Sequence, residues 1–582
     1  MSTTSKDIAH SVLKKPYAKG DTGQHGVQVI LVFIGLLLAM FVSSVSETIA
    51  ATALPTIVGD LNGVEIQQWV TTSYILASTI TMPIYGRLGD SIGRKGLLLF
   101  GLVVYTLGKV ICAIAPTMIV LIIGRVVSGI GGGGLIILTQ AAVADITPPS
   151  TRGKYLGIMG AEFAMATVLG PVLGGWFLAI SGWRLIFWFT VPIAAVAILF
   201  IILFYHVSYP HQKHLRFDVG GCIVMAIGVA ALILAVSWGG SQFAWDSWQI
   251  LCLFAVFLAC AIAFVLIERK AKNAIMPMYL FKDRNFTICS IAGMLIYIGI
   301  MGSVNYLPTF FQIVDKMDPI WAGLMPTPLS IGMFVASTAT GFIASKTGKY
   351  KWMLLVMAAG AAVSFALMGT LSESQPIILT LAIYAFGGLT IGTGTQILVL
   401  VVQNEFDHNI VGTATAANNF FRQIGSTLGA SLVGTLFTTR LTADLAGHLP
   451  RADNISVASI TPEAVDRLPE SVQHVIAQGY TDALVPLFIY FVPLCVVSFV
   501  LLLFIKQNPL RKTIDIVKPG MGAANDGRAI AASATDADAS SLPASASSDA
   551  GSRKDAGSPG DVNASMDDSA NSISISRTQD ES

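Results

Sequence analysis

The chain has 582 residues, of which 54% are apolar and only 12% are charged, and its mean hydropathy is +0.70. This composition excludes a soluble globular protein and indicates a polytopic membrane protein whose surrounding partner is lipid. The net charge of +1 comes from basic residues that are spread over the loops, so we expect no nucleic-acid partner.

Residues 1–27 are polar, contain lysines and lack a cleavable apolar core, which predicts a cytoplasmic N-terminal tail. Residues 437–482 are predicted to form an external loop, and residues 507–582 a disordered cytoplasmic tail that is too polar to fold. Fourteen apolar runs of membrane-spanning length lie between the tails. They fall near residues 29–54, 66–86, 97–115, 118–143, 156–180, 184–207, 218–238, 249–267, 287–312, 321–345, 352–371, 376–402, 411–436 and 483–506.

The distribution of basic residues predicts the orientation of these spans. With the N-terminus inside, the inner segments hold about 22 Lys and Arg residues and the outer loops about five. This asymmetry fits an even number of spans with both termini in the cytoplasm.

A ten-residue motif at residues 86–95, GRLGDSIGRK, separates the second and third apolar runs. Its charged residues cannot lie in hydrocarbon and its glycines permit sharp bends, so we expect a short water-facing turn that acts as a cytoplasmic gating loop. The residues with these properties are Gly86, Arg87, Gly89, Asp90, Gly93, Arg94 and Lys95. An imperfect copy, GFIASKTGKYK, occupies residues 341–351. The repeat predicts two halves built on one plan.

The two copies follow the second and tenth predicted spans, which are eight spans apart rather than six. This spacing predicts that two extra helices are inserted in mid-chain. We therefore expect an all-α polytopic membrane protein with six-helix bundles over residues 28–207 and 271–506, and two inserted helices over residues 208–270.

Asp90 offers two ways to hold the halves together. It can point at the N-terminus of a neighbouring helix, or it can pair with Arg87 or Arg94, and either contact would form a latch while the outside is open. The alternative is that these charges only orient the chain in the membrane. Ser345 stands in the copy where Asp90 stands in the motif, so we expect the first half to do most of the latching.

Charged residues inside membrane spans are costly and mark functional sites. Glu47 lies roughly 27 Å along the first predicted helix, at about 1.5 Å per residue. There it can line a cavity and exchange a proton for a cationic substrate, or it can be an interfacial residue near the outer headgroups. Arg125 keeps its charge, so it needs a partner, and it either tunes a nearby carboxylate or only staples helices.

Two further spans carry polar groups with two interpretations each. Glu162 is a second proton or cation site, or it pairs with an Arg or Lys. Arg422, together with Asn418 and Asn419, lines a cavity or makes interhelical hydrogen bonds. Lys109, in the third span, is a weaker candidate of the same kind.

The fifth predicted span contains Ala166, Gly170 and Gly174 at four-residue spacing. This spacing clears one helix face so that another backbone can approach closely, and Pro171 removes a backbone hydrogen bond and can bend the helix. The segment either takes part in gating or is plain small-residue packing.

Four motifs in order resemble those of the major facilitator superfamily, and within it the fourteen-helix drug:proton antiporter branch. They are SETIAATALPTIVGDL (46–61), GRLGDSIGRK (86–95), GRVVSGIGGGG (124–134) and LGPVLGG (169–175). The resemblance covers roughly residues 28–506. It implies a transporter fold, an antiporter motif at Gly170, Pro171, Gly174 and Gly175, and a link between Arg125 and proton transfer. The family's first-helix signature usually has Asp where this chain has Glu47.

No enzyme is expected, because the glycine-rich run lies in an apolar span without a following Lys-Ser/Thr and no nucleotide-binding domain exists. The six cysteines lie in apolar runs without CxxC, so we expect neither a metal nor another cofactor. Energy would come from an ion gradient. We expect a monomer in the cytoplasmic membrane that exports amphipathic or cationic compounds in exchange for protons. The alternatives are an exporter of one solute, such as a bile acid, siderophore or amino acid, and a transporter-like sensor.

Overall fold

The computed structural model describes residues 25–61, 63, 66–206, 218–240, 242–271, 273–304, 306–372, 375–448, 465 and 469–512. All of them belong to the first of two units, Met1–Ile516. The tails predicted at residues 1–27 and 507–582 lie almost wholly outside the described residues. Within the described part the chain is helical and contains no strand, apart from an isolated bridge between Gly239 and Phe243.

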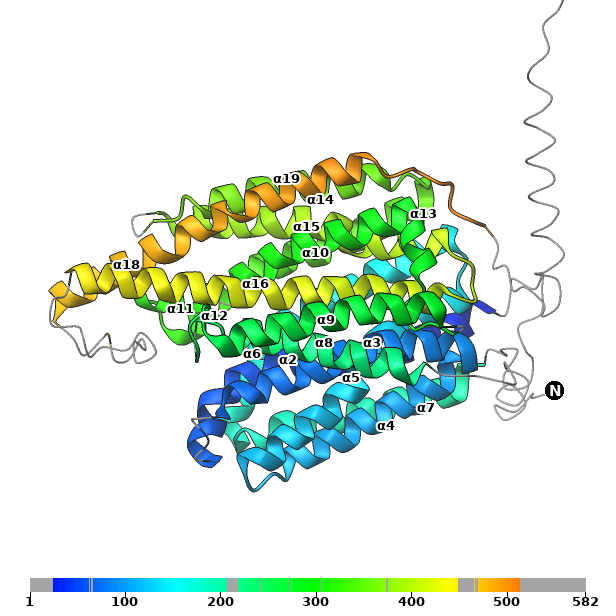
Figure 1. The fold of residues 1–582 in the computed structure, drawn as a ribbon, viewed down its shortest axis with the longest axis horizontal. Coiled ribbons are helices and arrows are strands. Elements are labelled where there is room, and N and C mark those ends of the chain that lie inside the picture. Colours follow the sequence, from blue (N-terminus) through cyan, green and yellow to red (C-terminus); the bar gives the residue numbers. More distant parts are fainter. Residues whose placement is uncertain are drawn as a thin grey trace, which may run out of the picture. The chain divides into compact units, whose positions relative to one another are not determined.

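Six helices of the first half pack around one another (Figure 1). They are α2 (His25–Leu61), α3 (Gln68–Ile92), α4 (Arg94–Ala113), α5 (Met118–Ile146), α6 (Pro149–Ser181) and α7 (Arg184–Phe204). Long apolar runs become helices because a helix satisfies all of its backbone hydrogen bonds internally, which hydrocarbon cannot do for it. Local caps set some of the ends, as where the Thr117 hydroxyl accepts a hydrogen bond from Val120 N at the start of α5.

The second half repeats this arrangement with more interruptions. Its helices are α10 (Arg284–Val304), α11 (Leu307–Ile313), α12 (Pro319–Leu324), α13 (Thr327–Thr347), α14 (Lys351–Met368), α15 (Ile377–Glu405), α16 (Val411–His448), α18 (Glu470–Ile489) and α19 (Phe491–Leu503). The halves meet mainly where α3 packs on α16 and where α6 packs on α13. These two helix pairs are called the first crossing and the second crossing below.

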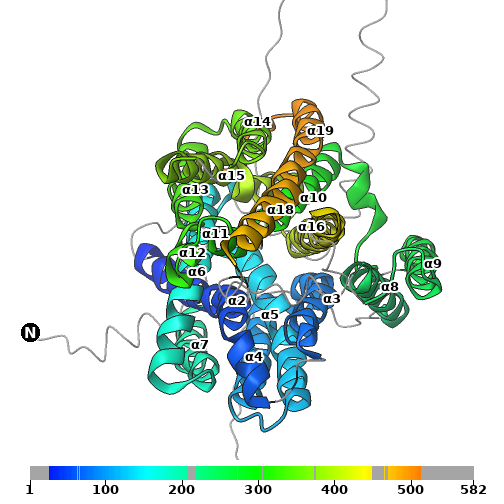
Figure 2. The same cartoon turned by 90° about the vertical axis from the view of Figure 1, so that its left-hand side faces the viewer.

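Two helices lie outside both halves. α8 (Val219–Trp238) and α9 (Trp248–Lys270) pack on each other, and α8 also contacts α3 and α16 (Figure 2). A short 3-10 helix, η2 (Met278–Lys282), follows α9 and leads into α10. This peripheral position is the one expected for helices inserted between two halves, and their division into separate domains stays a prediction.

Twelve helical stretches among the described residues are long and apolar enough to cross a membrane. They cover twelve of the fourteen predicted spans, and the other two, 66–86 and 411–436, fall on the long helices α3 and α16. Those two helices are the most polar, since α3 contains Arg87 and Asp90 and α16 contains Asn418 and Arg422. The chain is a multi-pass membrane protein, and the count of fourteen spans stays a prediction.

The prediction of a ten-residue water-facing turn at residues 86–95 is wrong. α3 continues to Ile92 and α4 begins at Arg94, so the chain reverses at the single residue Gly93, whose φ of 96° suits only glycine. Arg94 is fully buried rather than exposed to water. The helix tolerates these charges because they pair inside the protein, as described below. This end of the helices is called the Gly93 end.

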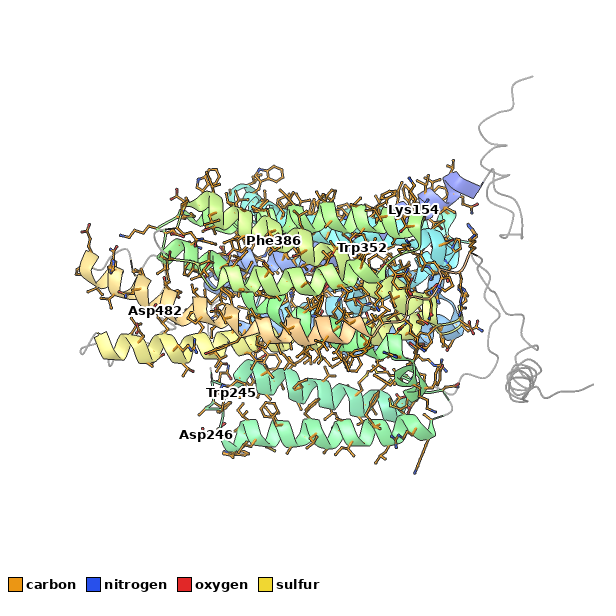
Figure 3. The ribbon with its side chains drawn as sticks, turned by 90° about the horizontal axis from the view of Figure 1, so that it is seen from above. Lys154, Trp245, Asp246, Trp352, Phe386 and Asp482 are labelled. Atoms are coloured by element: carbon orange, nitrogen blue, oxygen red, sulfur yellow. The ribbon has the colours of Figure 1, made fainter. Side chains whose placement is uncertain are left out.

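The external loop predicted at residues 437–482 is also shorter than expected. α16 runs on to His448 and α18 starts at Glu470, while residues 449–464 and 466–468 lie outside the described part. The two helices support each other, with the rings of Phe437 and Tyr480 4.9 Å apart. Figure 3 shows Lys154 of α6 toward the Gly93 end of the helices. The opposite end carries Asp482 of α18 and, between α8 and α9, Trp245 and Asp246.

Candidate functional site

A small central cavity lies between the two halves. Its polar lining residues come from α2, α5, α13, α15 and α16, and they are Glu47, Gln140, Ser337, Thr395, Gln396, Asn419, Arg422, Gln423 and Ser426. Methionines and aromatic rings, among them Met40, Met333 and Tyr297, form the rest of the wall. The cavity volume of about 80 Å³ is far below the roughly 300–1,000 Å³ of sites that hold drug-sized ligands. The halves must therefore separate before a molecule of that size can enter.

Glu47 is half-buried in the cavity wall, and the residue before it binds two cations. The Ser46 hydroxyl accepts a hydrogen bond from Lys109 Nζ, and it lies 3.5 Å from Nη1 of Arg125. Both cations interact electrostatically with the Glu47 carboxylate. The structure thus brings together the predicted acid of the first span and the predicted bases of the third and fourth spans.

Aromatic rings and carbonyl groups, rather than carboxylates, hold the two cations directly. Arg125 donates from Nε to the Val70 carbonyl at 2.8 Å, and its guanidinium lies 4.5 Å from the centre of the Tyr74 ring. Lys109 Nζ lies 5.0 Å from the Tyr105 ring and 5.5 Å from that of Phe187. Both side chains are only 1% exposed. Cation–π contacts of this kind stabilise a charge that is shielded from water.

The antiporter-motif glycines pack on α2 beside Glu47. A Cβ atom on Gly170 would lie 2.0 Å from Oγ1 of Thr48, and one on Gly174 would lie 2.2 Å from Oγ1 of Thr52. The Thr48 hydroxyl also donates to the Ala166 carbonyl at 3.2 Å. The two glycines therefore let α6 approach α2 closely, whereas Gly175 has open space around it. α6 continues as one helix through Pro171, which lies in this same contact region.

Glu162 lies about two helical turns before Gly170 on α6, and it is 6% exposed. Its two carboxylate oxygens accept no hydrogen bond of normal geometry, although the Ser44 side chain lies beside them. Glu162 forms no ion pair with any described residue, so the predicted pairing with an Arg or Lys is not found. Its carboxylate is a second buried acid, separate from the cluster around Glu47.

Of the polar residues of α16, Asn418 makes an interhelical hydrogen bond, whereas Asn419 and Arg422 line the central cavity. Asn418 donates to the Ser290 hydroxyl at 3.2 Å, which is an interhelical hydrogen bond. Asn419 lines the cavity and donates to Oε1 of Gln140 in the other half at 2.9 Å. Arg422 also lines the cavity, and its guanidinium lies 4.6 Å from the Tyr297 ring centre.

Asp90 joins the two halves at the Gly93 end. Its carboxylate accepts hydrogen bonds from Gly412 N at 3.0 Å, and from Thr413 N and Oγ1 at 2.6 and 2.8 Å. These residues form the first turn of α16, whose backbone N–H groups have no partner within the helix. Asp90 also pairs with Arg94 at 2.7 Å. Both contacts that the sequence suggested as alternatives are present together.

Arg94 extends this network into the first half. It donates to the Asp145 carboxylate, to the Ala141 carbonyl at 2.8 Å and to the His408 carbonyl at 3.2 Å. The His408 ring lies 3.3 Å from Asp145, and burial holds the pKa of His408 below its usual range despite that carboxylate. A neutral imidazole at this place leaves Arg94 as the cation between Asp90 and Asp145.

The other two basic residues of the motif have separate roles. Lys95 donates to the Ile202 carbonyl at 3.0 Å, which ties α4 to the end of α7. Arg87 points toward the α9–η2 connection, where its Nη2 lies 3.5 Å from Oδ1 of Asn273.

The second crossing has glycines, and it has Ser345 at the position where the first crossing has Asp90. Ser345 accepts a hydrogen bond from Lys154 N at 2.9 Å, and a Cβ atom on Gly341 would lie 2.4 Å from the Gly153 carbonyl oxygen. At the first crossing, a Cβ atom on Gly86 would likewise lie 2.3 Å from that of Ala416. The two crossings share close backbone contact and differ in charge.

Residues 505–512, called the C-terminal strap here, run across the Gly93 end. Asn508 donates to both carboxylate oxygens of Glu405 at 2.8 and 3.0 Å, and its backbone N–H donates to the Tyr350 hydroxyl at 2.8 Å. The Arg511 carbonyl then accepts a hydrogen bond from Ser150 N, at the start of α6, at 3.0 Å. The strap thus links the second half to the first.

Several residues of these networks were missed from the sequence. Asp145, Gln140 and His408 stand out in the structure, because they connect the halves or the charges between them. Asp145 lies two residues beyond the predicted span 118–143, and a longer fourth span would have placed it among the costly intramembrane charges. Gln140 and His408 carry no comparable signal, because single neutral polar residues are frequent in membrane helices and loops.

Two helical halves around a polar central cavity, embedded in a multi-pass membrane framework, define a membrane transporter rather than an enzyme. The family model described as Major Facilitator Superfamily matches residues 36–430. The chain therefore belongs to the major facilitator superfamily.

Relatives and solved structures agree with this assignment. The chain is 36% identical over 413 residues to the multidrug transporter protein MdtP of Bacillus subtilis, covering 70% of this chain and 75% of that protein. It is 32% identical over 498 residues to multidrug resistance protein 3 of the same organism, covering 84% and 97%. The solved structure of the proton:xylose symporter XylE has the same fold, with a TM-score of 0.55, 15% identity and coverage of 84% and 98%.

Proposed function

We propose that this transporter exports amphipathic or cationic drugs and other toxic compounds across the plasma membrane in exchange for protons. The Gly93 end and both termini would face the cytoplasm, and the chain would act as a monomer built from two six-helix bundles and two inserted helices. The names of the bacterial relatives, both multidrug proteins, support the substrate class. The basic residues concentrated in the predicted inner loops support the orientation.

One observation carries the coupling mechanism. Glu47 lies in the wall of the central cavity and interacts with two buried cations that are held by aromatic rings and carbonyls. When Glu47 is ionised, its carboxylate attracts a cationic substrate into the cavity. When Glu47 is protonated, the remaining charge of Arg125 and Lys109 repels that substrate. Proton and substrate thus compete for one carboxylate, which is the requirement for antiport.

The Asp90 latch at the Gly93 end would control the conformational change of the transport cycle. Asp90 and the first turn of α16 hold the cytoplasmic side closed, so that the cavity can open only to the outside. Release of this contact would let the halves rock apart and expose Glu47 to the cytoplasm. The close packing of α6 on α2 beside Glu47 would transmit protonation to the second crossing, because α6 takes part in both contacts.

Transport into vesicles with an imposed pH gradient tests this proposal. Glu47→Gln keeps the shape of the side chain but cannot ionise, so gradient-driven transport of a monovalent cation should fall to background. Glu47→Asp keeps the charge and should retain much of the activity. Arg125→Lys should be damaging, because Lys lacks the planar fork that contacts Val70 and Tyr74 together.

Glu162→Gln is the comparison variant, since Glu162 is a buried acid of the first half that does not line the cavity. It should keep gradient-driven transport if Glu47 alone carries the proton, and a loss equal to that of Glu47→Gln would make Glu162 a second proton site. If Glu47→Gln transports both a cation and a neutral compound at the parent rate, Glu47 does not couple the proton. A parent protein whose transport is unaffected by collapse of the pH gradient would reject proton coupling altogether.

A further inference from the structure

A second cavity lies at the Gly93 end, away from the central one. It has a volume of about 660 Å³, and its walls are the last turns of α3 and α9 and the connection that ends in η2. Met278 and Phe281 give it an apolar side, and Tyr279 adds an aromatic ring with a hydroxyl. Neither Glu47 nor any other residue of the central cavity contributes to it.

The charged residues of this cavity are mainly basic. Arg87, Arg269 and Lys282 face a single acid, Glu268. Glu268 is 3% exposed, and its two oxygens accept the backbone N–H groups of Ile275 at 3.1 Å and Met276 at 3.3 Å. These two hydrogen bonds of Glu268 hold the chain that follows α9 in place. Because three basic residues face this single acid, the lining of the cavity has an excess of positive charge.

Arg87 has hydrogen-bond donors that no described residue accepts at normal distance. Its Nη2 makes only a long contact of 3.5 Å with Asn273, and its Nε is buried without a hydrogen bond. A buried guanidinium donor without an acceptor is costly, and phosphate oxygens match its planar fork. The preferred ligand of this cavity is therefore an anion with several oxygens.

The position of the cavity identifies the source of such an anion. α9 exposes Leu258, Ile262 and Leu266 by more than half, so it faces lipid, and it ends in Arg269 and Lys270 at the depth where headgroups begin. We propose that the cavity binds the phosphate headgroup of an anionic phospholipid of the cytoplasmic leaflet, with the start of an acyl chain against Met278 and Phe281.

An occupied cavity would act on the latch through α3. Arg87 lies less than one turn before Asp90, and its carbonyl accepts a hydrogen bond from the Ser91 hydroxyl at 2.9 Å. A phosphate held between Arg87 on α3 and Lys282 on η2 fixes the end of α3, and with it the Asp90 contact to α16. Anionic lipid thereby favours the state that is closed toward the cytoplasm. This consequence rests on the proposed function, whereas the binding itself does not.

Lipid retention measured by native mass spectrometry tests the site without a transport assay. The full chain is purified, delipidated and mixed with phosphatidylglycerol or with phosphatidylcholine. The double variant Arg269→Gln and Lys282→Gln should bind phosphatidylglycerol about 30-fold more weakly, because each basic residue near an anionic lipid contributes roughly fivefold. Retention of phosphatidylcholine should not change.

The matched control is the double variant Lys346→Gln and Lys349→Gln, which removes two exposed basic residues at the same end, next to the second crossing. It should bind phosphatidylglycerol like the parent chain. Equal losses in the two variants, or no loss in the first, would overturn the proposal.

If inorganic phosphate displaces phosphatidylglycerol as well as glycerol phosphate does, the cavity is a site for free phosphate and the lipid source is wrong. The single variant Arg269→Gln gives the same test if the double variant does not fold.

Discussion

The first and second crossings solve the same packing problem with different chemistry. At both, a glycine brings two backbones into contact, Gly86 against Ala416 in the first and Gly341 against Gly153 in the second. Four residues after its glycine, the first crossing has Asp90, which accepts four hydrogen bonds. Four residues after its glycine, the second crossing has Ser345, which accepts one. The repeat therefore preserves the close glycine contact at both crossings, whereas the acidic residue at this position is present at the first crossing only.

This difference assigns the two crossings different parts of the closed state. Hydrogen bonds to a charged group are worth about twice those between neutral groups, and Asp90 also lies at the positive end of α16. The second crossing has the C-terminal strap beside it, which reaches the start of α6 through Ser150. We expect the first crossing to hold the Gly93 end closed and the second crossing to guide the relative sliding of α6 and α13.

The largest effect is expected from Asp90→Asn. The amide can still accept a hydrogen bond from α16, but it loses the charge that interacts with Arg94 and the helix end. Losing about 1.5–3 kcal/mol from charged hydrogen bonds should lower export at least about tenfold, at unchanged amount in the membrane. The loss of export is measured as the efflux of a fluorescent cation from cells, normalised to the amount of protein expressed. Parent-like efflux would mean that the motif only orients the chain.

Alanine at the two glycines should give effects that resemble each other. Gly86→Ala and Gly341→Ala each force a Cβ atom to within 2.4 Å of the partner helix, so each should cost about 1–3 kcal/mol and lower export by about tenfold. Ala416→Gly should partly restore Gly86→Ala, because it removes the contacting methyl group. Full activity of Gly341→Ala would show that the second crossing is looser than described.

A smaller effect is expected when the strap is weakened. Glu405→Gln removes the charge that binds Asn508 and Asn285, and it should lower export by about two- to fivefold. Backbone hydrogen exchange over residues 505–512 should become faster. Asp407→Asn is the control, because the Asp407–Arg511 pair is largely exposed and contributes little. Equal changes in the two variants would contradict a specific role for Glu405.

The smallest effect is expected from Ser345→Ala. It removes one neutral hydrogen bond, to Lys154 N, and leaves the glycine contact intact. A loss of about 0.5 kcal/mol, at the low end for one neutral hydrogen bond, should change export by about twofold, which is less than Asp90→Asn does. The same efflux assay compares the two directly. A loss as large as that of Asp90→Asn would remove the distinction between the crossings.

Much of this arrangement could be predicted from the sequence, because hydrocarbon imposes simple rules. Every predicted span falls on one helix or, for 287–312, 321–345 and 483–506, on two consecutive helices. The repeat at residues 341–351 lies at a matching helix junction. Asp90 was predicted to contact a helix N-terminus or Arg94, and it does both. The sequence predicts a reversal within residues 86–95, but not that it occurs at Gly93 alone or that its charges are buried. Charge favours exposure to water, whereas Arg94 is buried between two acids.

Pairing across the halves was the part that sequence could not supply. Asn419 meets Gln140, which is 279 residues earlier, and neither residue carries a pattern that points to the other. The same holds for the strap, whose polar residues resemble the start of a tail until Glu405 and Ser150 are placed beside them. Such contacts depend on how two folded halves dock, which local hydropathy does not encode.

A distance measurement across the second crossing tests the central claim most directly. Spin labels are placed at Thr151 on α6 and Lys346 on α13, in a chain whose six cysteines are replaced by serine. Double electron–electron resonance then compares the parent, Asp90→Asn and Ser345→Ala. If the charge at the first crossing holds both halves closed, Asp90→Asn will shift the distribution to longer distances although Asp90 lies at the other crossing, and Ser345→Ala will leave it nearly unchanged. An unchanged distribution in Asp90→Asn, or an equal shift in the two variants, would contradict the account.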